Sequence, residues 1–218
     1  MTPRKGFSML ETKPATRTRL LAARTSTPGA ERGRADLETW KALRAFLIES
    51  VDEGATIAAY RPFGAEPGAT LEPELPERLT VVYKVLLPVL LPDNDLAWEA
   101  VGPLGTQEEG ADSPFGGPAA GGAGPDGENG GPSNARLAPE AVGEVAAVIV
   151  PGLAVSHDGM RLGRGGGSYD RALARVGPGV PVVALLRDDE FGVPVPAEPH
   201  DRPVTGVVTP GRGFVSLR

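Results

Sequence analysis

Apolar residues along the chain fall into short runs that are rich in β-branched side chains and bounded by glycine, proline or charged residues. Runs of this length and composition predict buried β-strands. Because polar residues hardly interrupt them, the strands are expected to be buried on both faces of a sheet. The predicted strands are residues 56–60, 81–87 (ending near Pro88), 148–150, 180–186 and 204–208.

Between these runs, apolar residues recur every three or four positions, which predicts helices. The first covers about residues 15–24. The second has Asp36 as its N-cap and ends before Gly54, and the third covers residues 168–175 with Ser168 as its N-cap. The apolar face of the second helix is formed by Leu37, Trp40, Leu43 and Leu47. Strands that alternate with helices predict an α/β fold, a single domain with a mainly parallel sheet and helices on both faces.

Two segments lack any such pattern. Residues 1–12 show no periodicity and are predicted to be a flexible tail. From about residue 102 to residue 135, glycine, proline and alanine dominate and large apolar side chains are nearly absent. Such a segment cannot bury enough surface to offset its ordering entropy, so it is predicted to be a disordered insertion, with a mobile lid as the alternative. The domain is therefore expected to cover residues 13–218 with one interruption.

Composition narrows the functional class. With 218 residues and 40% hydrophobic residues, the chain can bury one proper core. The absence of cysteine excludes disulfides, thiolate metal ligands and cysteine nucleophiles. No apolar leader or membrane-length run is present, so we expect a cytoplasmic protein with no membrane partner. The net charge of -6 argues against general nucleic-acid binding.

The amino-terminal region has the opposite charge balance. The first 44 residues hold ten Lys and Arg against four Asp and Glu. Either these cations simply face water or some of them contact phosphate.

The densest chemical signal lies between residues 145 and 171. A β-branched run is followed by Arg161, Arg164 and a glycine cluster, and then by the predicted helix start. Glycines can bring backbone N–H groups close to a ligand, a helix start favours negative charge, and guanidinium groups suit phosphate or carboxylate. This arrangement predicts an anion site. The segment fits neither the dinucleotide fingerprint, because the third glycine is misplaced, nor the phosphate loop, which needs Gly-Lys-Ser/Thr.

Three pieces of this segment together resemble a known signature. The pieces are Pro151-Gly-Leu-Ala-Val, Asp158-Gly-Met-Arg-Leu-Gly-Arg-Gly-Gly-Gly and Tyr169-Asp-Arg. They resemble the 5-formyltetrahydrofolate cyclo-ligase family, also called methenyltetrahydrofolate synthetases. A separate segment further along the chain also matches the family, namely Val195-Pro-Ala-Glu-Pro-His-Asp-Arg-Pro-Val204. The likeness runs from about Lys13 to Phe214.

The resemblance implies a fold like that of sugar-phosphate isomerases and coenzyme A transferases, in a monomer. It also implies an enzyme that uses ATP and Mg²⁺ to convert a reduced folate, 5-formyltetrahydrofolate, into 5,10-methenyltetrahydrofolate with release of ADP and phosphate. In the family's chemistry the formyl oxygen attacks the γ-phosphate and the second folate nitrogen then captures the activated carbon. Positioning and charge neutralisation dominate such a reaction, which suits a site of glycine amides and arginines.

Carried onto this sequence, the resemblance assigns roles to individual residues. Arg164 and Tyr169 are the expected catalytic residues. Asp170 and Asp201 are the expected Mg²⁺ ligands, since Mg²⁺ needs only one or two carboxylates beside water and phosphates. The expected substrate-binding residues are Arg61, Glu66, Arg164, Gly167 and Ser168. The expected ATP-binding residues are Lys13, Arg17, Arg161, Leu162, Gly163, Arg164, Gly165, Gly166, Gly167, Ser168 and Tyr169, and Arg24 continues the basic spacing of the first helix.

Each assignment has a plainer alternative. Asp170 would be favourable near a helix start whatever its function, and Asp201 would suit a turn. Glu66 reads as a surface turn residue, Arg171 and Arg175 as solvated cations, and His157 as a loop residue without a role. Tyr60 and Trp98 are the sort of aromatic residues that could stack on a pterin, but core packing is favoured for both.

Two departures from the family pattern keep a second function open. Ser168 stands where the family has a tyrosine beside the folate, and the family's Gly-x-x-Glu-Pro segment is replaced by the insertion. The alternative is a degenerate relative that binds nucleotide or folate without turnover. A third hypothesis keeps only the fold-level likeness, with a glycine loop that binds phosphate without ATP.

Overall fold

In the computed structural model, a single sheet runs through the centre of the described chain, which comprises residues 11–102, 136–198 and 201–217. The strand order is β3-β2-β1-β4-β7-β8-β9. The inner pairs β1–β2, β1–β4, β4–β7 and β7–β8 are parallel, and the outer pairs β2–β3 and β8–β9 are antiparallel. The strands are β1 (Thr56–Ala58), β2 (Lys84–Leu90), β3 (Leu96–Ala100), β4 (Ala147–Pro151), β7 (Val182–Leu185), β8 (Gly206–Thr209) and β9 (Gly213–Ser216).

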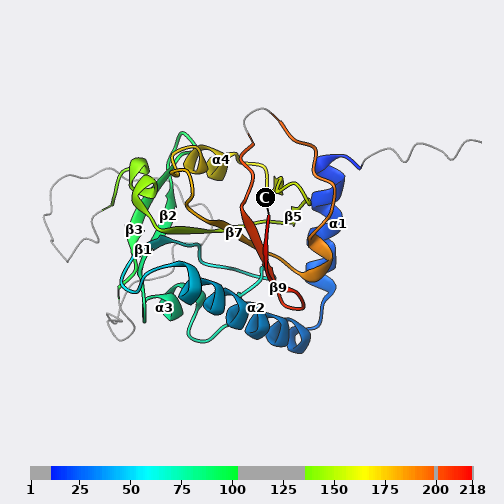
Figure 1. Ribbon diagram of the computed structural model, residues 1–218. Helices are drawn as coiled ribbons and strands as arrows, with labels where there is room; N and C mark the ends of the chain where they lie inside the picture. The colour runs from blue at the N-terminus through cyan, green and yellow to red at the C-terminus, as the bar shows by residue number, and fades with distance from the viewer. Residues whose placement is uncertain (1–10, 103–135, 199–200, 218) are drawn as a thin grey trace, which may run out of the picture.

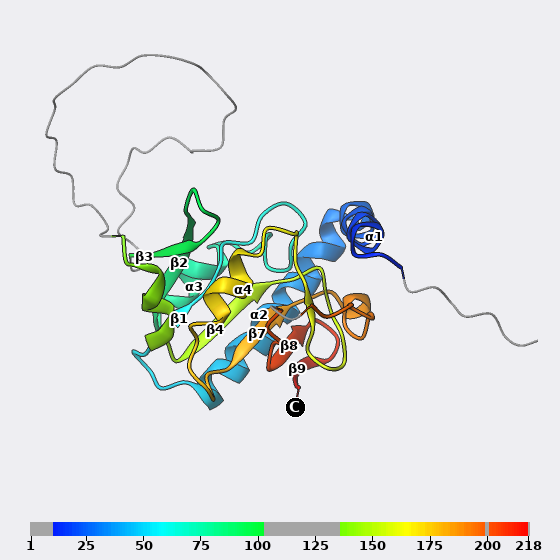
Figure 2. The ribbon, with the colours of Figure 1, turned by 90° about the horizontal axis from the view of Figure 1, so that it is seen from above.

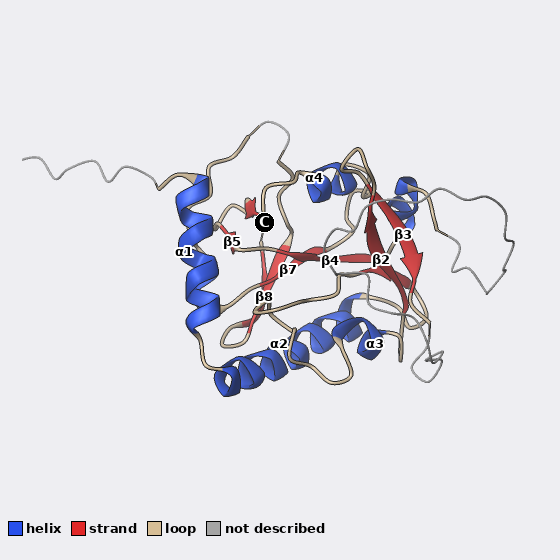
Figure 3. Cartoon of the chain, turned by 180° about the vertical axis from the view of Figure 1, so that it is seen from behind, coloured by secondary structure: helices blue, strands red, loops and turns tan. Residues whose placement is uncertain are grey.

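Helices cover the two faces of this sheet, which confirms the predicted α/β class (Figures 1 and 3). On one face lie α2 (Gly29–Ser50) and α3 (Leu75–Leu79), and on the other lie α4 (Ser168–Leu173) and the 3₁₀ turn η1 (Pro139–Glu144). A second 3₁₀ turn, η2 (Asp188–Glu190), follows β7.

The core lies on both faces of the central strands. Val148 and Val150 of β4 pack with the α4 side, whereas Ile149 packs with Leu43 and Leu47 of α2. Successive strand residues point to opposite faces, so a run without polar alternation is what a strand covered on both sides requires. Both predicted core aromatics are buried, since Tyr60 and Trp98 are only 4% and 1% exposed.

The first helix, α1 (Lys13–Ser26), packs elsewhere. It stands at the end of the sheet beside a two-stranded hairpin, β5 (Ala154–Val155) and β6 (Arg161–Leu162) (Figures 1 and 2). Leu20 of α1 forms a separate small core with Leu153, Leu162 and Val195. This cluster brings the amino-terminal cations next to the segment that carries the glycine motif.

The order of the strands indicates where a ligand is expected to bind, at the carboxyl ends of β1 and β4. From β1 the chain proceeds to β2 on one side, and it later returns to place β4 on the other side of β1. Ligands of open α/β sheets bind at the carboxyl ends of strands where the direction of winding reverses in this way. The turn with Glu66 follows β1, and the β5–β6 hairpin with the glycine cluster follows β4. The topology therefore places both segments at the same edge of the sheet, and the junction between them is called the crevice here.

The second helix corrects one prediction. It begins at Gly29, so Asp36 lies inside it and is not its N-cap. The carboxylate of Asp36 is fully buried and bonds Thr70 and Arg187, which is a tertiary role that a local capping pattern does not distinguish. Leu37, predicted on the apolar face, is 44% exposed, whereas Leu43 and Leu47 are buried as expected.

The second strand is shifted from its predicted position. It covers residues 84–90 and passes through Pro88, which was expected to end it. Pro88 lies opposite Trp98, whose own N–H and C=O bond Leu137 on the far side. Pro88 and Trp98 are therefore a non-hydrogen-bonded pair of the β2–β3 ladder. On the other side of β2, β1 has already ended. The missing N–H of Pro88 thus costs no hydrogen bond to either neighbouring strand.

Parts of the sequence expectations fall outside the described residues. These parts are residues 1–10 of the predicted tail and residues 103–135 of the predicted insertion. Thr12, at the end of that tail, accepts a hydrogen bond from the Ala15 N–H as the N-cap of α1. Within the described ranges, no helix combines the length and the apolar character needed to cross a bilayer.

Candidate functional site

The glycine loop, residues 163–167, connects β6 to α4 and forms one side of the crevice. Gly167 is the N-cap of α4 and has a left-handed backbone, with φ of 70°. The predicted N-cap Ser168 is instead the first residue of the helix, because glycine adopts the left-handed conformation more readily than serine does. No side chain caps this helix.

Two glycines of this loop lie against arginine side chains. A Cβ at Gly163 would lie 2.8 Å from Nη1 of Arg161. Gly165 has φ of 110°, and a Cβ there would meet the guanidinium of Arg17 at 3.5 Å. The cluster therefore lets two arginines approach the backbone closely from the two sides of the loop.

Helix α1 supplies cations to the same loop. Nε of Arg17 donates a hydrogen bond of 2.9 Å to the carbonyl of Gly163. One turn earlier, Nζ of Lys13 lies 2.7 Å from Glu198 and 3.2 Å from Asp201. Residues four apart share a helix face, so one face of α1 contacts both the glycine loop and the Asp201 segment. Burial acts to lower the pKa of Lys13, but the hydrogen bonds to Glu198 and Asp201 prevail and raise it.

Arg161 lies beneath the loop and is largely buried, with its side chain only 4% exposed. Its Nη2 contacts Asp170 at 3.2 Å, and its Nη1 donates to the carbonyl of Pro151 at 3.3 Å. Its buried Nε has no hydrogen-bond partner in the described part of the chain. The guanidinium lies 5.5 Å from the centre of the Tyr169 ring, and burial raises the pKa of Tyr169 well above its ordinary value.

An ion pair crosses the crevice. Nη2 and Nε of Arg164 lie 3.0 and 3.2 Å from Oε1 of Glu66, 98 residues away in sequence. The Arg164 guanidinium also lies 4.7 Å from the centre of the exposed Phe63 ring. The Arg164 side chain is 50% exposed, whereas that of Glu66 is only 5% exposed. Glu66 is thus not the surface turn residue of the plainer interpretation, and Arg164 lies over its carboxylate.

The two predicted metal ligands both occur in ion pairs. Asp170 contacts Arg161, and Asp201 contacts Lys13 and accepts a hydrogen bond from the Glu198 N–H at 2.8 Å. The described residues contain no group of three or more histidine, cysteine or acidic side chains able to hold a metal. One or two carboxylates would still fit Mg²⁺, which takes most of its ligands from water and phosphates.

Several other predicted residues lie away from the loop. The guanidinium of Arg61 contacts Glu74 and Glu77 near α3, at 2.6 Å for Glu77. Arg24, which continues the basic spacing of α1, is buried and bonds both oxygens of Glu190 at 2.6 and 2.7 Å. These bonds and a third, to the carbonyl of Gly152, attach α1 to the interior of the protein.

Arg175, which was expected to be a solvated cation, forms an ion pair instead. Its guanidinium bonds both oxygens of Asp95 at 2.9 and 2.5 Å. His157, expected to have no role, packs edge-on against Phe191 with ring centres 5.1 Å apart. Leu162 is buried in the small core beside α1, so its side chain supports the loop from below.

Sequence reasoning missed Asp36 and Arg187, which hold the turn that carries Glu66. Asp36 gave a misleading local signal because it resembles a cap. Arg187 follows a predicted strand at its carboxyl end, and that position was the available signal.

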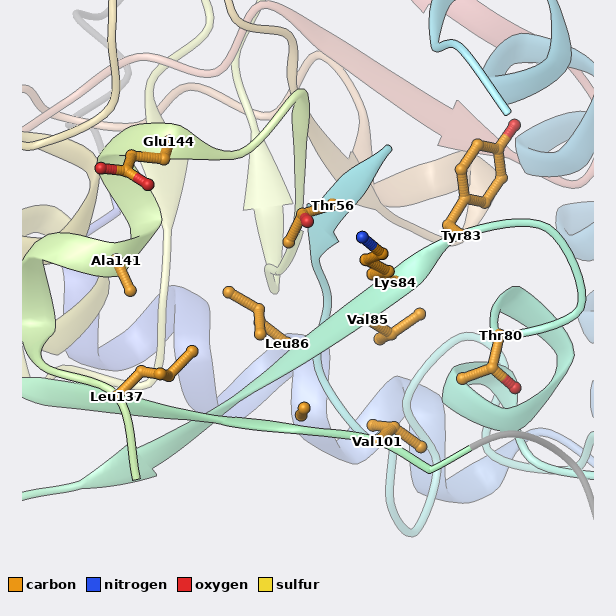
Figure 4. A pocket seen from close by; sticks show the side chains of 11 residues that line it. Thr56, Thr80, Tyr83, Lys84, Val85, Leu86, Val101, Leu137, Ala141 and Glu144 are labelled. Carbon is orange, nitrogen blue, oxygen red and sulfur yellow. The ribbon is translucent and has the colours of Figure 1, made fainter. Parts of the chain in front are cut away.

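A cavity of about 540 Å³ lies at the other end of the parallel strands (Figure 4). Thr56 and Lys84, the first residues of β1 and β2, line it together with apolar side chains such as Val101 and Leu137. None of the predicted site residues borders this cavity.

Comparison with known proteins agrees with the motif. The model of the 5-formyltetrahydrofolate cyclo-ligase family matches residues 9–210. The 5-formyltetrahydrofolate cyclo-ligase of Mycolicibacterium smegmatis is 40% identical over 214 residues, which cover 94% of this chain and 97% of that protein.

Solved structures share the fold. A 5,10-methenyltetrahydrofolate synthetase from Mycoplasma pneumoniae superposes with a TM-score of 0.68 at 19% identity, over 92% of this chain and 99% of that chain. The synthetase of Aquifex aeolicus gives 0.66 at 25% identity, over 94% and 93% of the two chains. Glycine motif, crevice and comparisons lead to one conclusion: the chain belongs to the 5-formyltetrahydrofolate cyclo-ligase family.

Proposed function

We propose that this protein uses ATP and Mg²⁺ to convert 5-formyltetrahydrofolate into 5,10-methenyltetrahydrofolate, with release of ADP and phosphate. The observation that supports this most directly is the Glu66–Arg164 pair across the crevice. It joins a carboxylate suited to the N–H groups of a pterin to a cation suited to a transferring phosphoryl group. The two substrates of such a reaction would therefore meet where these two side chains meet.

The ATP phosphates would lie on the glycine loop. Backbone N–H groups of residues 163–167 offer donors, and Arg17 already contacts the loop at Gly163. Lys13, on the same face of α1, adds charge from the side of Asp201. ATP would supply the γ-phosphoryl group that accepts the formyl oxygen. The loop and the α1 cations would hold that group still while Arg164 neutralises the charge that develops on it.

The folate would occupy the Glu66 side of the crevice. Its formyl oxygen leaves within the released phosphate, and its second nitrogen forms the new C–N bond and loses its proton. Glu66 would orient the pterin, and Gly167 and Ser168 would border it. Burial raises the pKa of Tyr169, so its hydroxyl stays protonated and is available as a donor to the reacting oxygen.

The carboxylates of Asp170 and Asp201 would hold Mg²⁺ together with phosphate oxygens. The metal would reduce the charge of the phosphates during transfer. Asp170 would have to exchange its contact with Arg161 for the metal, and Asp201 its contact with Lys13. Both cations would then be free to contact the phosphates. This exchange suits a site that assembles only when its ligands are present.

The test is the ultraviolet absorbance of the methenyl product, followed with purified protein, Mg²⁺ and 5-formyltetrahydrofolate, with and without ATP. We expect product only when ATP and Mg²⁺ are both present, in equal amount to the ADP formed. Folded protein that binds ATP by calorimetry and forms no product would contradict the proposal and favour a non-catalytic relative. Ser168→Tyr, which restores the family's residue, would then show whether this position is responsible.

A further inference from the structure

The turn that carries Glu66 depends on two residues outside it. Residues 61–74 contain no strand, so no sheet ladder fixes this segment. Within the turn, the N–H of Glu66 bonds the carbonyl of Phe63 at 3.1 Å, and the N–H of Ala69 bonds the carbonyl of Glu66 at 3.1 Å. These local bonds define the shape of the turn. Leu71 packs the far part of the segment into the core, and the backbone around Glu66 needs other contacts to hold its position.

Asp36 and Arg187 supply that position. Nη2 of Arg187 lies 3.3 Å from both carbonyl oxygens of Ala65 and Glu66, at the start of the turn. Asp36 accepts hydrogen bonds from the N–H and hydroxyl of Thr70, at 3.0 and 2.7 Å, at its end. The two side chains are joined to each other, with Nη1 of Arg187 2.6 Å from Oδ1 of Asp36. Together they hold the turn at both ends.

This pair lies deep in the protein. The Asp36 side chain is fully buried in the middle of α2, and the Arg187 side chain is 13% exposed just beyond β7. A buried ion pair is a poor device for stability, because apolar side chains of similar size often stabilise as well. It is well suited to fixing direction, because its donors and acceptors bond defined groups of the protein. The directed partners here are the backbone atoms of the Glu66 turn.

We propose that Arg187, held by Asp36, is a positioning residue that sets the Glu66 carboxylate for substrate binding. This inference rests on the proposed function, in which Glu66 binds the reduced folate. In the Glu66 turn, the Arg187 side chain contacts backbone carbonyls and not the Glu66 carboxylate, so it acts by placing Glu66 and not on the substrate. Its loss should impair recognition of the folate and leave the ATP side, which lies on the glycine loop and α1, intact.

The first experiment compares Arg187→Met with Arg187→Lys by steady-state kinetics. We expect the KM for 5-formyltetrahydrofolate to rise at least about tenfold in Arg187→Met, the size of a lost charge-assisted hydrogen bond, with the KM for ATP within about twofold. Arg187→Lys keeps the charge but cannot bridge Asp36 and two carbonyls. Its KM for 5-formyltetrahydrofolate should therefore lie between those of the parent protein and Arg187→Met. Equal rises in both KM values would contradict the positioning role.

A double-mutant cycle with Glu66→Gln tests whether the effect passes through Glu66. If Arg187 acts only by placing that carboxylate, Arg187→Met should add little to the folate KM of Glu66→Gln. Multiplication of the two single effects would show a general structural role and overturn the inference. Should Arg187→Met fail to fold, Thr70→Val removes one hydrogen bond to Asp36 while keeping both charges, and should raise the same KM by a smaller factor.

Arg175→Met is the matched control. It breaks the Arg175–Asp95 pair, which also joins distant segments through two short contacts but does not touch the turn. Its folate KM should stay unchanged, and a rise equal to that of Arg187→Met would contradict the inference. The activity of the unaltered protein distinguishes a failure of the proposed function from a failure of the positioning role. If it forms no product, the proposed function fails, whereas an active protein whose Arg187→Met variant keeps the parent KM values contradicts the positioning role alone.

Discussion

At the scale of single residues, the sequence predicts that Arg164 contacts an anion, but it does not predict which anion. Its place among glycines predicts contact with an anion, because no apolar surface there would hold a long cationic side chain. In the structure the anion that Arg164 contacts is Glu66, another predicted site residue. The sequence could identify both residues as candidates, but their pairing depends on a fold that joins positions 98 residues apart.

Replacement of Arg164 by alanine should separate activity from stability. The pair with Glu66 is half exposed on the arginine side, and surface pairs contribute about 1 kcal/mol or less, so the melting temperature should change little. If Arg164 stabilises the transferring phosphoryl group, kcat/KM should fall at least about a hundredfold. Steady-state kinetics and thermal unfolding measure the two effects.

Arg19→Ala is the control for this substitution. Arg19 forms an exposed pair with Glu11 on α1, 3.0 Å apart, and takes no part in the crevice. Its kinetics should equal those of the parent. If Arg164→Ala also turned over at a near-normal rate, Arg164 would be a solvated cation without a role in catalysis.

At the scale of elements, the inner parallel strands and the two long helices follow from apolar patterning. The outer strands β3 and β9 do not. β9 is only partly buried, and the buried part of β3 is just three residues, Leu96 to Trp98, so neither strand shows a clear apolar pattern. The same limit explains Asp36, whose chemistry is decided by partners in other elements. Patterns along the chain record local burial, whereas ion pairs such as Asp36–Arg187 depend on which elements meet.

The attachment of α1 to the rest of the protein provides an element-scale prediction. Arg24 bonds both oxygens of Glu190 and the carbonyl of Gly152 at 2.6 Å, all within the interior. Arg24→Met would leave Glu190 buried with only the Arg187 N–H, at 2.8 Å, as its donor. The free energy of unfolding should fall by about 3–5 kcal/mol, measured by urea denaturation.

The more exposed Arg175–Asp95 pair offers the comparison. Its side chains are 29% and 13% exposed, so Arg175→Met should cost about 1 kcal/mol or less. Equal losses in the two variants would contradict the assignment of Arg24 as the buried anchor of α1.

For the whole molecule, the Glu66–Arg164 pair predicts cooperation between the two substrates. Arg164 cannot bind Glu66 and a phosphate at once, so ATP should draw it away and uncover the Glu66 carboxylate. A non-hydrolysable ATP analogue should then lower the Kd for 5-formyltetrahydrofolate by a factor of about 5–150, the usual size of such coupling. Isothermal titration with and without the analogue measures it.

Two variants check the origin of this cooperation. In Arg164→Ala and in Glu66→Gln the competing pair is absent, so the analogue should change the folate Kd little. Coupling that survives in both variants would have another cause. By linkage the folate should raise the affinity for the analogue by the same factor in the unaltered protein.

The contacts of α1 have a consequence for the order in which the molecule is made. This helix leaves the ribosome well before its partners Gly163, Glu190, Glu198 and Asp201, which follow the α1 residues that contact them by 146 to 188 positions. Chains emerge at about 5–20 residues per second, so α1 must wait roughly ten seconds or more before it can dock. Its basic residues and narrow apolar face, formed by Leu20 and Leu21, suit such a delay, because a helix with a broad apolar face would favour aggregation before docking.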